Sequence, residues 1–177
     1  MSNTFFRYLL WLLFFVLLQE LVFEQIPLGT YVCPMVYVLF ILMLPVGYSP
    51  VSVLLWAFFL GICVDTFSHG IMGTHTISIV AMAYVRPFFL KLVTSKEDRE
   101  NMTQLQAIHT MGARYFVTYA SLAVVLHHTI YFLIDTFSFF NITHTLLLIA
   151  LSSLLSITLV FILSSLTVPR RKSNTFS

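Results

Sequence analysis

The amino-acid sequence predicts an all-α protein that crosses a membrane with six transmembrane helices. Of its 177 residues, 59% are hydrophobic and only 9% are charged, whereas about a quarter of the residues in a soluble globular domain are charged. The hydrophobic residues form continuous runs, such as residues 51–60 and 146–151, and lack the alternation of transmembrane β-strands. The chain is long enough for six spans of about 20 residues with short connections. This composition argues against a soluble enzyme and against a nucleic-acid-binding module.

The first two predicted helices are separated by a proline- and glycine-containing break. The first covers about residues 5–23, and Pro27 and Gly29 end it. Polar residues follow its apolar run without a small-residue cleavage site, so we expect a retained helix and not a signal peptide. The second covers about residues 30–44 and ends before Pro45.

The third and fourth predicted helices are joined by a glycine-containing corner. The third helix covers residues 50–65, because Ser49 can cap its free backbone N–H groups and Pro50 fits its first position. The corner covers residues 66–73. The fourth helix covers residues 74–92.

The last two predicted helices follow the most polar part of the chain, residues 95–101, which is expected to be a surface loop or a short interfacial helix. The fifth helix covers residues 112–134. The sixth covers residues 145–168, and Pro169 ends it. In this helix Ser152 and Ser156 are four residues apart, which predicts close packing on a neighbouring helix.

A single six-helix domain over residues 1–177 places both termini and two of the loops on one side of the membrane. That side holds all nine lysine and arginine residues, so the positive-inside rule makes both termini cytoplasmic. Part of this charge forms a predicted basic collar, which consists of Lys91, Lys96, Arg99 and Arg114. The collar is interpreted as a determinant of topology that contacts anionic lipids, or as a docking surface for a cytoplasmic partner.

The corner between the third and fourth helices contains the most distinctive residues. Ala57, Gly61 and Asp65 recur every four residues and therefore share one helix face, and the two small residues allow another helix to approach closely. Asp65 is expected to accept backbone N–H groups at the start of the fourth helix. A ligand-binding or proton-relay role is the alternative. Gly70 and Gly73 permit a tight turn.

The motif G-x3-D-x2-S with a following G-x2-G, and a helix that leads into an Arg-Pro pair, resembles the MreD family of bacterial rod shape-determining membrane proteins. The residues that carry this resemblance, or pack the helices beside it, are Ala57, Gly61, Asp65, Ser68, Gly70, Gly73, Arg86 and Pro87. The resemblance implies a fold similar to the six-helix substrate-binding subunits of vitamin-uptake transporters. We place Arg86 and Pro87 at the cytoplasmic end of the fourth helix, next to the basic collar.

The resemblance also implies a function without catalysis and without a cofactor. MreD proteins belong to the cell-wall elongation (Rod) complex of the bacterial cytoplasmic, or inner, membrane. They bind MreC and, through it or directly, the MreB filament and the glycan polymerase RodA with its partner transpeptidase. The implied role is to support lateral peptidoglycan synthesis and cell shape. The phospholipid bilayer is the other expected partner, and a nucleic-acid partner is not expected.

Polar residues near the outer face form a second candidate site, which we call the outer polar cluster: His69, His75, His127, Tyr131 and Asp135. Its last three members are four residues apart and form a polar stripe on the fifth helix. Histidine and aspartate are zinc ligands, but no compact motif such as H-E-x-x-H occurs. Hydrogen bonds between helices are the simpler interpretation, so no metal is expected.

Two other functions remain open from the sequence. A substrate-binding subunit for vitamin uptake would need a pocket under the outer loops, lined by residues such as Trp56, Asp65 and His127. A small intramembrane metalloenzyme would use the outer histidine and aspartate residues.

Overall fold

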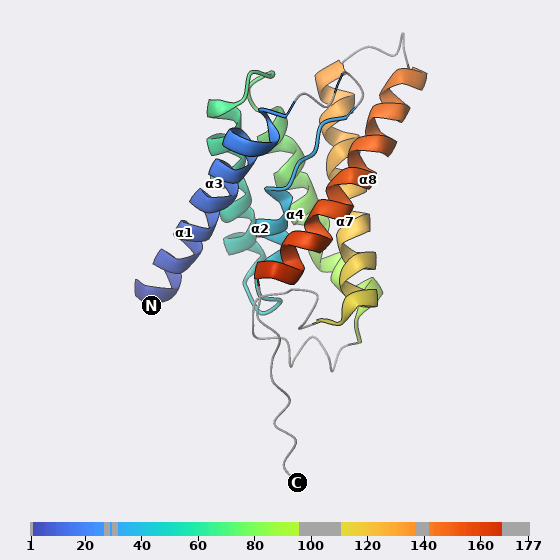
Figure 1. Cartoon of the computed structure of the whole chain (residues 1–177). Coiled ribbons are helices and arrows are strands. Elements are labelled where there is room, and N and C mark those ends of the chain that lie inside the picture. Colours follow the sequence, from blue (N-terminus) through green and yellow to red (C-terminus); the bar gives the residue numbers. More distant parts are fainter. Residues whose placement is uncertain (1, 27–28, 30–31, 96–110, 137–141, 168–177) are drawn as a thin grey trace.

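The computed structural model describes residues 2–26, 29, 32–95, 111–136 and 142–167. This part of the chain is helical (Figure 1), and its elements are α1 (Ser2–Leu18), the π-helix η1 (Gln19–Phe23), α2 (Val38–Met43), α3 (Pro50–Phe67), α4 (Thr74–Val93), α7 (Ala113–Thr136) and α8 (Ile142–Thr167). Five helices are long and apolar enough to cross a membrane, namely α1 with η1, α3, α4, α7 and α8. The all-helical class is therefore confirmed, and the count of six regular transmembrane helices is not.

The predicted second helix, residues 30–44, is wrong as a regular span. Only Val38–Met43 are α-helical, and residues 32–36 have no regular secondary structure. Pro34 gives one physical reason, because proline has no N–H group to donate and disfavours helical geometry at the residue before it. The irregular segment and α2 together, residues 32–44, are called the central segment below.

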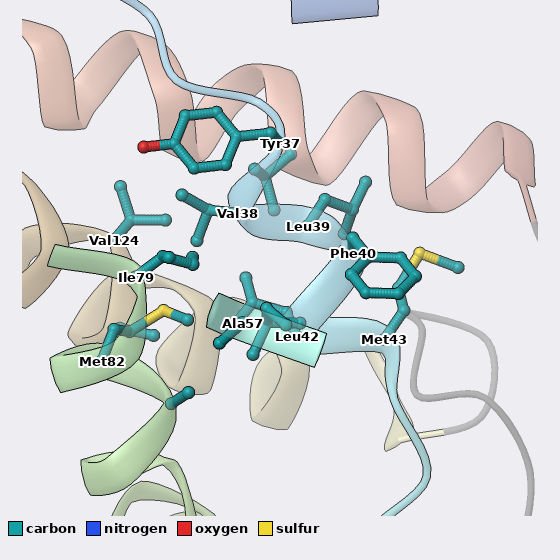
Figure 2. Packing of buried hydrophobic residues seen from close by; sticks show 14 of the residues in the cluster. Tyr37, Val38, Leu39, Phe40, Leu42, Met43, Ala57, Ile79, Met82 and Val124 are labelled. Atoms are coloured by element: carbon teal, nitrogen blue, oxygen red, sulfur yellow. The ribbon is translucent and has the colours of Figure 1, made fainter. Parts of the chain in front are cut away.

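The central segment forms the middle of the hydrophobic core. Every residue from Met35 to Leu44 is at most 3% exposed, although the chain there is only partly helical. Helices α3, α4, α7 and α8 pack in that order, each against the next, and α2 lies between α1 and α8 in the view of Figure 1. Figure 2 shows side chains of α2 close to Ala57 of α3, Met82 of α4 and Val124 of α7.

Serine side chains of α8 satisfy backbone N–H groups of the central segment. The N–H of Cys33 donates to Ser152 Oγ and the N–H of Met35 donates to Ser156 Oγ, both over 2.9 Å. An irregular backbone at membrane depth is stable only where protein groups replace the missing helical hydrogen bonds. The small-residue spacing predicted for α8 therefore has a concrete role, since both serines face the central segment.

Gln19, the first residue of η1, binds the central segment on both sides of Met35. Its Oε1 accepts from the N–H of Val36 at 2.9 Å, and its Nε2 donates to the carbonyl of Pro34 at 3.0 Å. The side chain is 2% exposed. Short π-helical turns are rare and often mark sites with a special role; here the turn begins at the glutamine that ties α1 to the core.

The Ser156→Ala substitution is expected to lower the free energy of unfolding by about 2 kcal/mol, because the N–H of Met35 then has no partner in the core. The measurement is an equilibrium SDS titration in mixed micelles, followed by circular dichroism. Thr158→Ala is the control, since the hydroxyl of Thr158 bonds only the carbonyl of Leu154 in its own helix and is exposed. Equal losses in the two variants would contradict the role given to Ser156.

Candidate functional site

The α3–α4 pair is built on a glycine that allows backbone contact. A Cβ atom on Gly61 would lie 2.5 Å from the Cα of Thr76 and 3.0 Å from Ile79 Cγ2, which is too close for any side chain. One turn earlier, Ala57 is completely buried. The close approach of another helix is therefore confirmed at Gly61, where the neighbour is α4 of the same chain.

Asp65 caps the N-terminus of α4 from the neighbouring helix, as the sequence predicts. Its Oδ1 accepts from the N–H of His75 at 3.0 Å, and its Oδ2 accepts from the N–H of Thr76 at 3.0 Å and from Thr76 Oγ1 at 2.5 Å. The N-cap residue itself is Gly73, which has a φ of +95° and no side chain to offer. The carboxyl group of Asp65 supplies what that glycine lacks, at the helix end that favours negative charge.

The other residues of the corner have backbone roles. Ser68 follows the last residue of α3, and its N–H donates to the carbonyl of Val64 at 2.8 Å. A Cβ atom on Gly70 would make ordinary contact with the hydroxyl of Tyr131 at 3.6 Å. The corner thus lies against α7, which carries the polar stripe.

Tyr37 of the central segment joins two histidines from different helices. Its hydroxyl lies 2.8 Å from His75 Nδ1 of α4 and 2.9 Å from His127 Nε2 of α7. Tyr37 and His127 are fully buried, and His75 is 6% exposed. Tyr131 covers His75, with ring centroids 4.6 Å apart. The result is a hydrogen-bonded chain across the core, which we call the Tyr37 chain.

The single proton of the Tyr37 hydroxyl fixes a direction along this chain. Tyr37 can donate to only one histidine and must accept from the other. Within the described part of the structure, His127 Nδ1 is buried and has no partner. A buried N–H without an acceptor is rarer than a bare acceptor. For neutral imidazoles, we therefore infer that His127 Nε2–H donates to Tyr37 and that Tyr37 donates to His75 Nδ1.

A second histidine of α7, His128, forms a separate set of hydrogen bonds toward α8. His128 is fully buried, its Nδ1 lies 2.9 Å from the carbonyl of Val124, and its Nε2 lies 3.1 Å from Ser156 Oγ. Ser156 also accepts the N–H of Met35. The imidazole therefore supports the serine that holds the central segment.

The predicted outer polar cluster is only partly assembled. His75, His127 and Tyr131 come together around Tyr37. His69 is exposed, and Asp135 is partly exposed near the end of α7. Among the described residues no group of three or more histidine, cysteine, aspartate or glutamate side chains is arranged to hold a metal ion.

Arg86 lies in a different place from the one expected. The prediction put it next to the basic collar at the cytoplasmic helix end, but its side chain is 3% exposed and lies in the core. The end of α4 itself agrees with the prediction, since the helix continues through Pro87 to Val93. Arg86 Nε donates to the hydroxyl of Tyr119 at 2.9 Å, and Nη2 donates to the carbonyl of Leu44. The hydroxyl of Tyr119 in turn donates to the carbonyl of Leu42 at 3.4 Å. Arg86 therefore binds the end of the central segment.

The basic collar is seen in part. Lys91 and Arg114 are exposed, as expected for residues that contact water or lipid headgroups. Lys96 and Arg99 lie outside the described residues. The sequence pattern missed Tyr37, Gln19 and Tyr119, since a single polar or aromatic residue within an apolar run gives no signal of its own.

The Tyr37→Phe substitution is expected to lower the free energy of unfolding by about 2 kcal/mol, because a ring nitrogen of each histidine loses its buried partner. The measurement is the same SDS titration. Tyr84→Phe is a matched control, since Tyr84 is 75% exposed on α4. A loss no larger than in the control would show that the Tyr37 chain does not stabilise the fold.

The fold and the site together define a class of protein, a multi-pass helical protein. Its helices are long and apolar enough to cross a membrane. Its core contains an irregular segment that polar side chains hold by hydrogen bonds. A comparison of the chain with known protein families, with curated proteins and with solved structures found no match.

Proposed function

We propose that this protein is an MreD-like scaffold of the bacterial cell-wall elongation complex, which binds an MreC-type membrane protein in the cytoplasmic membrane and catalyses no reaction itself. The observation that carries the proposal is that the buried polar side chains form hydrogen bonds within the protein itself. Asp65 accepts hydrogen bonds from the start of α4, and Tyr37 bonds two histidines. Arg86 donates to a backbone carbonyl of the central segment. What the protein offers to other molecules is therefore its outer surface.

The residues of the motif support this proposal through their structural roles. Gly61 lets α3 and α4 touch, and Asp65 and Gly73 build the start of α4. A scaffold needs a rigid arrangement of helices, since its function is to hold other proteins in fixed positions. A motif that specifies one helix pair is consistent with such a role.

The course of the chain supports the proposed topology. α1 begins at the end of the bundle where α8 ends (Figure 1). The central segment returns from the end of η1 to the start of α3. The five irregular residues 32–36, if fully extended, and the six residues of α2 reach at most about 25 Å, somewhat less than the thickness of the hydrocarbon core, which is about 30 Å. In this proposal the central segment is the sixth crossing, and both termini are cytoplasmic.

The substrate-binding alternative gains no support from the placement of its proposed residues. Trp56 lines an apolar groove between α1 and α3. Asp65 and His127, by contrast, are buried and hydrogen-bonded at the start of α4 and in the Tyr37 chain. The three residues therefore do not share one pocket.

The test is co-purification and depletion in a rod-shaped bacterium that carries this protein. We expect the solubilised protein to co-purify with an MreC-type protein, and depleted cells to lose their rod shape. Gly47→Ala should restore the shape of depleted cells, because nothing lies within 4 Å of a Cβ there. Normal shape in depleted cells would contradict the proposal, whereas a co-purified vitamin would favour the substrate-binding alternative.

A further inference from the structure

An apolar groove runs between α1 and α3. Its volume is about 460 Å³, and its lining residues are Phe5, Leu9, Leu12 and Leu13 of α1 and Ser52, Leu55, Trp56, Phe59 and Cys63 of α3. All of them belong to helices that are apolar enough to span a membrane. The occupant of the groove must therefore come from the membrane.

The length of the groove selects the kind of occupant. From Ser52 to Cys63 the wall formed by α3 is about 16 Å long at 1.5 Å per residue, and the wall formed by α1, from Phe5 to Leu13, is shorter. The hydrocarbon core of a bilayer is about 30 Å thick. The groove thus covers one leaflet, and it begins at the membrane boundary where both helices begin.

The volume and the chemistry of the groove agree with this length. The volume of about 460 Å³ leaves room for a flexible apolar chain. Close packing of transmembrane helices relies on small residues and on polar groups that bond across the interface. Leucine and aromatic side chains dominate this lining, and its one hydroxyl, that of Ser52, already bonds Ser49 Oγ at 2.8 Å.

We propose that the α1–α3 groove is a binding site for one acyl chain of a phospholipid from the leaflet where α1 and α3 begin. A full transmembrane helix is about twice as long as the groove, whereas a single acyl chain spans one leaflet, about half of the hydrocarbon core. The bound chain packs α1 against α3, in a region where Trp56 of α3 also contacts Phe5 and Tyr8 of α1, with ring centroids 5.4 Å and 6.3 Å away. This inference goes beyond the proposed function and does not depend on it.

The first experiment uses Trp56 as a reporter in nanodiscs that contain a phospholipid brominated on its acyl chain. Trp11→Phe removes the other tryptophan of the protein and serves as the background. Quenching of Trp56 fluorescence is measured against the fraction of brominated lipid. We expect the quenching to follow the fraction of brominated lipid as it would for one lipid-binding site. Quenching that follows the fraction as it would for several equivalent lipids would overturn the proposal.

Paired variants test the position of the site. Leu9→Phe with Leu13→Phe narrows the groove, and Leu10→Phe with Leu17→Phe makes the same change at exposed positions of α1 outside it. We expect the first pair to reduce the quenching at least twofold and the second pair to leave it unchanged. Equal quenching in the two pairs would overturn the proposal. Leu9→Phe alone replaces the first pair if that pair does not fold.

Native mass spectrometry gives a second readout. The protein and the Leu10→Phe, Leu17→Phe control should retain one phospholipid each after delipidation, and the Leu9→Phe, Leu13→Phe variant should retain none. Equal retention in all three would contradict the assignment. So would a photo-cross-link from position 13 to a protein helix in intact membranes, because the groove would then hold a protein partner.

Discussion

The Asp65→Ala substitution is expected to have the largest effect on stability, a loss of about 4 kcal/mol in the free energy of unfolding. The carboxyl group accepts from two backbone N–H groups, those of His75 and Thr76, and from the hydroxyl of Thr76. Alanine leaves all three donors without this acceptor in a site where Asp65 is 5% exposed. A hydrogen bond to an ionised group contributes about 1.5–3 kcal/mol, and the three losses are not additive. SDS titration in mixed micelles measures the loss.

Two further variants separate the cap from a general effect of losing an acid. Asp65→Asn keeps one side-chain oxygen as an acceptor, so we expect it to lose roughly half as much stability. Asp135→Ala removes a partly exposed carboxyl group near the end of α7 and should change stability little. Similar losses for Asp65→Ala and Asp135→Ala would show that capping of α4 is not what Asp65 contributes.

Gly61→Ala is expected to cost about 3 kcal/mol, since one added methyl group must push α3 and α4 apart. Its Cβ would lie 2.5 Å from the backbone Cα of Thr76, and a backbone atom cannot rotate away as a side chain does. Overpacking of a well-packed core costs about 1–3 kcal/mol, and a clash with backbone lies at the upper end. The unfolding midpoint in the SDS titration reports the loss.

Gly47→Ala is the matched control for this substitution. Among the described residues nothing lies within 4 Å of a Cβ atom there, and Gly47 has no positive φ. Its stability should equal or slightly exceed that of the unchanged protein, because alanine reduces the conformational entropy of the unfolded chain. Equal losses at both glycines would mean that contact between α3 and α4 is not the cause.

Much of the helical architecture could be predicted from local sequence. The start of α3 follows from Ser49 and Pro50, and Ser49 Oγ accepts from the N–H of Ser52 at 3.1 Å. The pairing of α3 with α4 follows from Gly61 and Asp65, because the spacing of four residues puts them on one face and a short corner joins the two helices. Contacts between elements that are close together in the chain can be recognised from such short sequence patterns.

Arg86 and the central segment could not be predicted in the same way. Hydropathy gives residues 30–44 the same signal whether lipid or protein surrounds them, so it predicts a regular helix. The irregular backbone is stable because partners far away in the sequence complete its hydrogen bonds. Ser152 is 119 residues from Cys33, and Arg86 is 42 residues from Leu44.

The sequence by itself determined five of the six predicted helices, with their ends to within a few residues, and the capping of α4 by Asp65. These properties depend on composition and on residues close together in the chain. Only the tertiary structure decided that the central segment is irregular and that Tyr37 joins two histidines. The physical reason is that a buried polar group needs a partner but does not specify which one, and the packing of α4, α7 and α8 around the central segment supplies it.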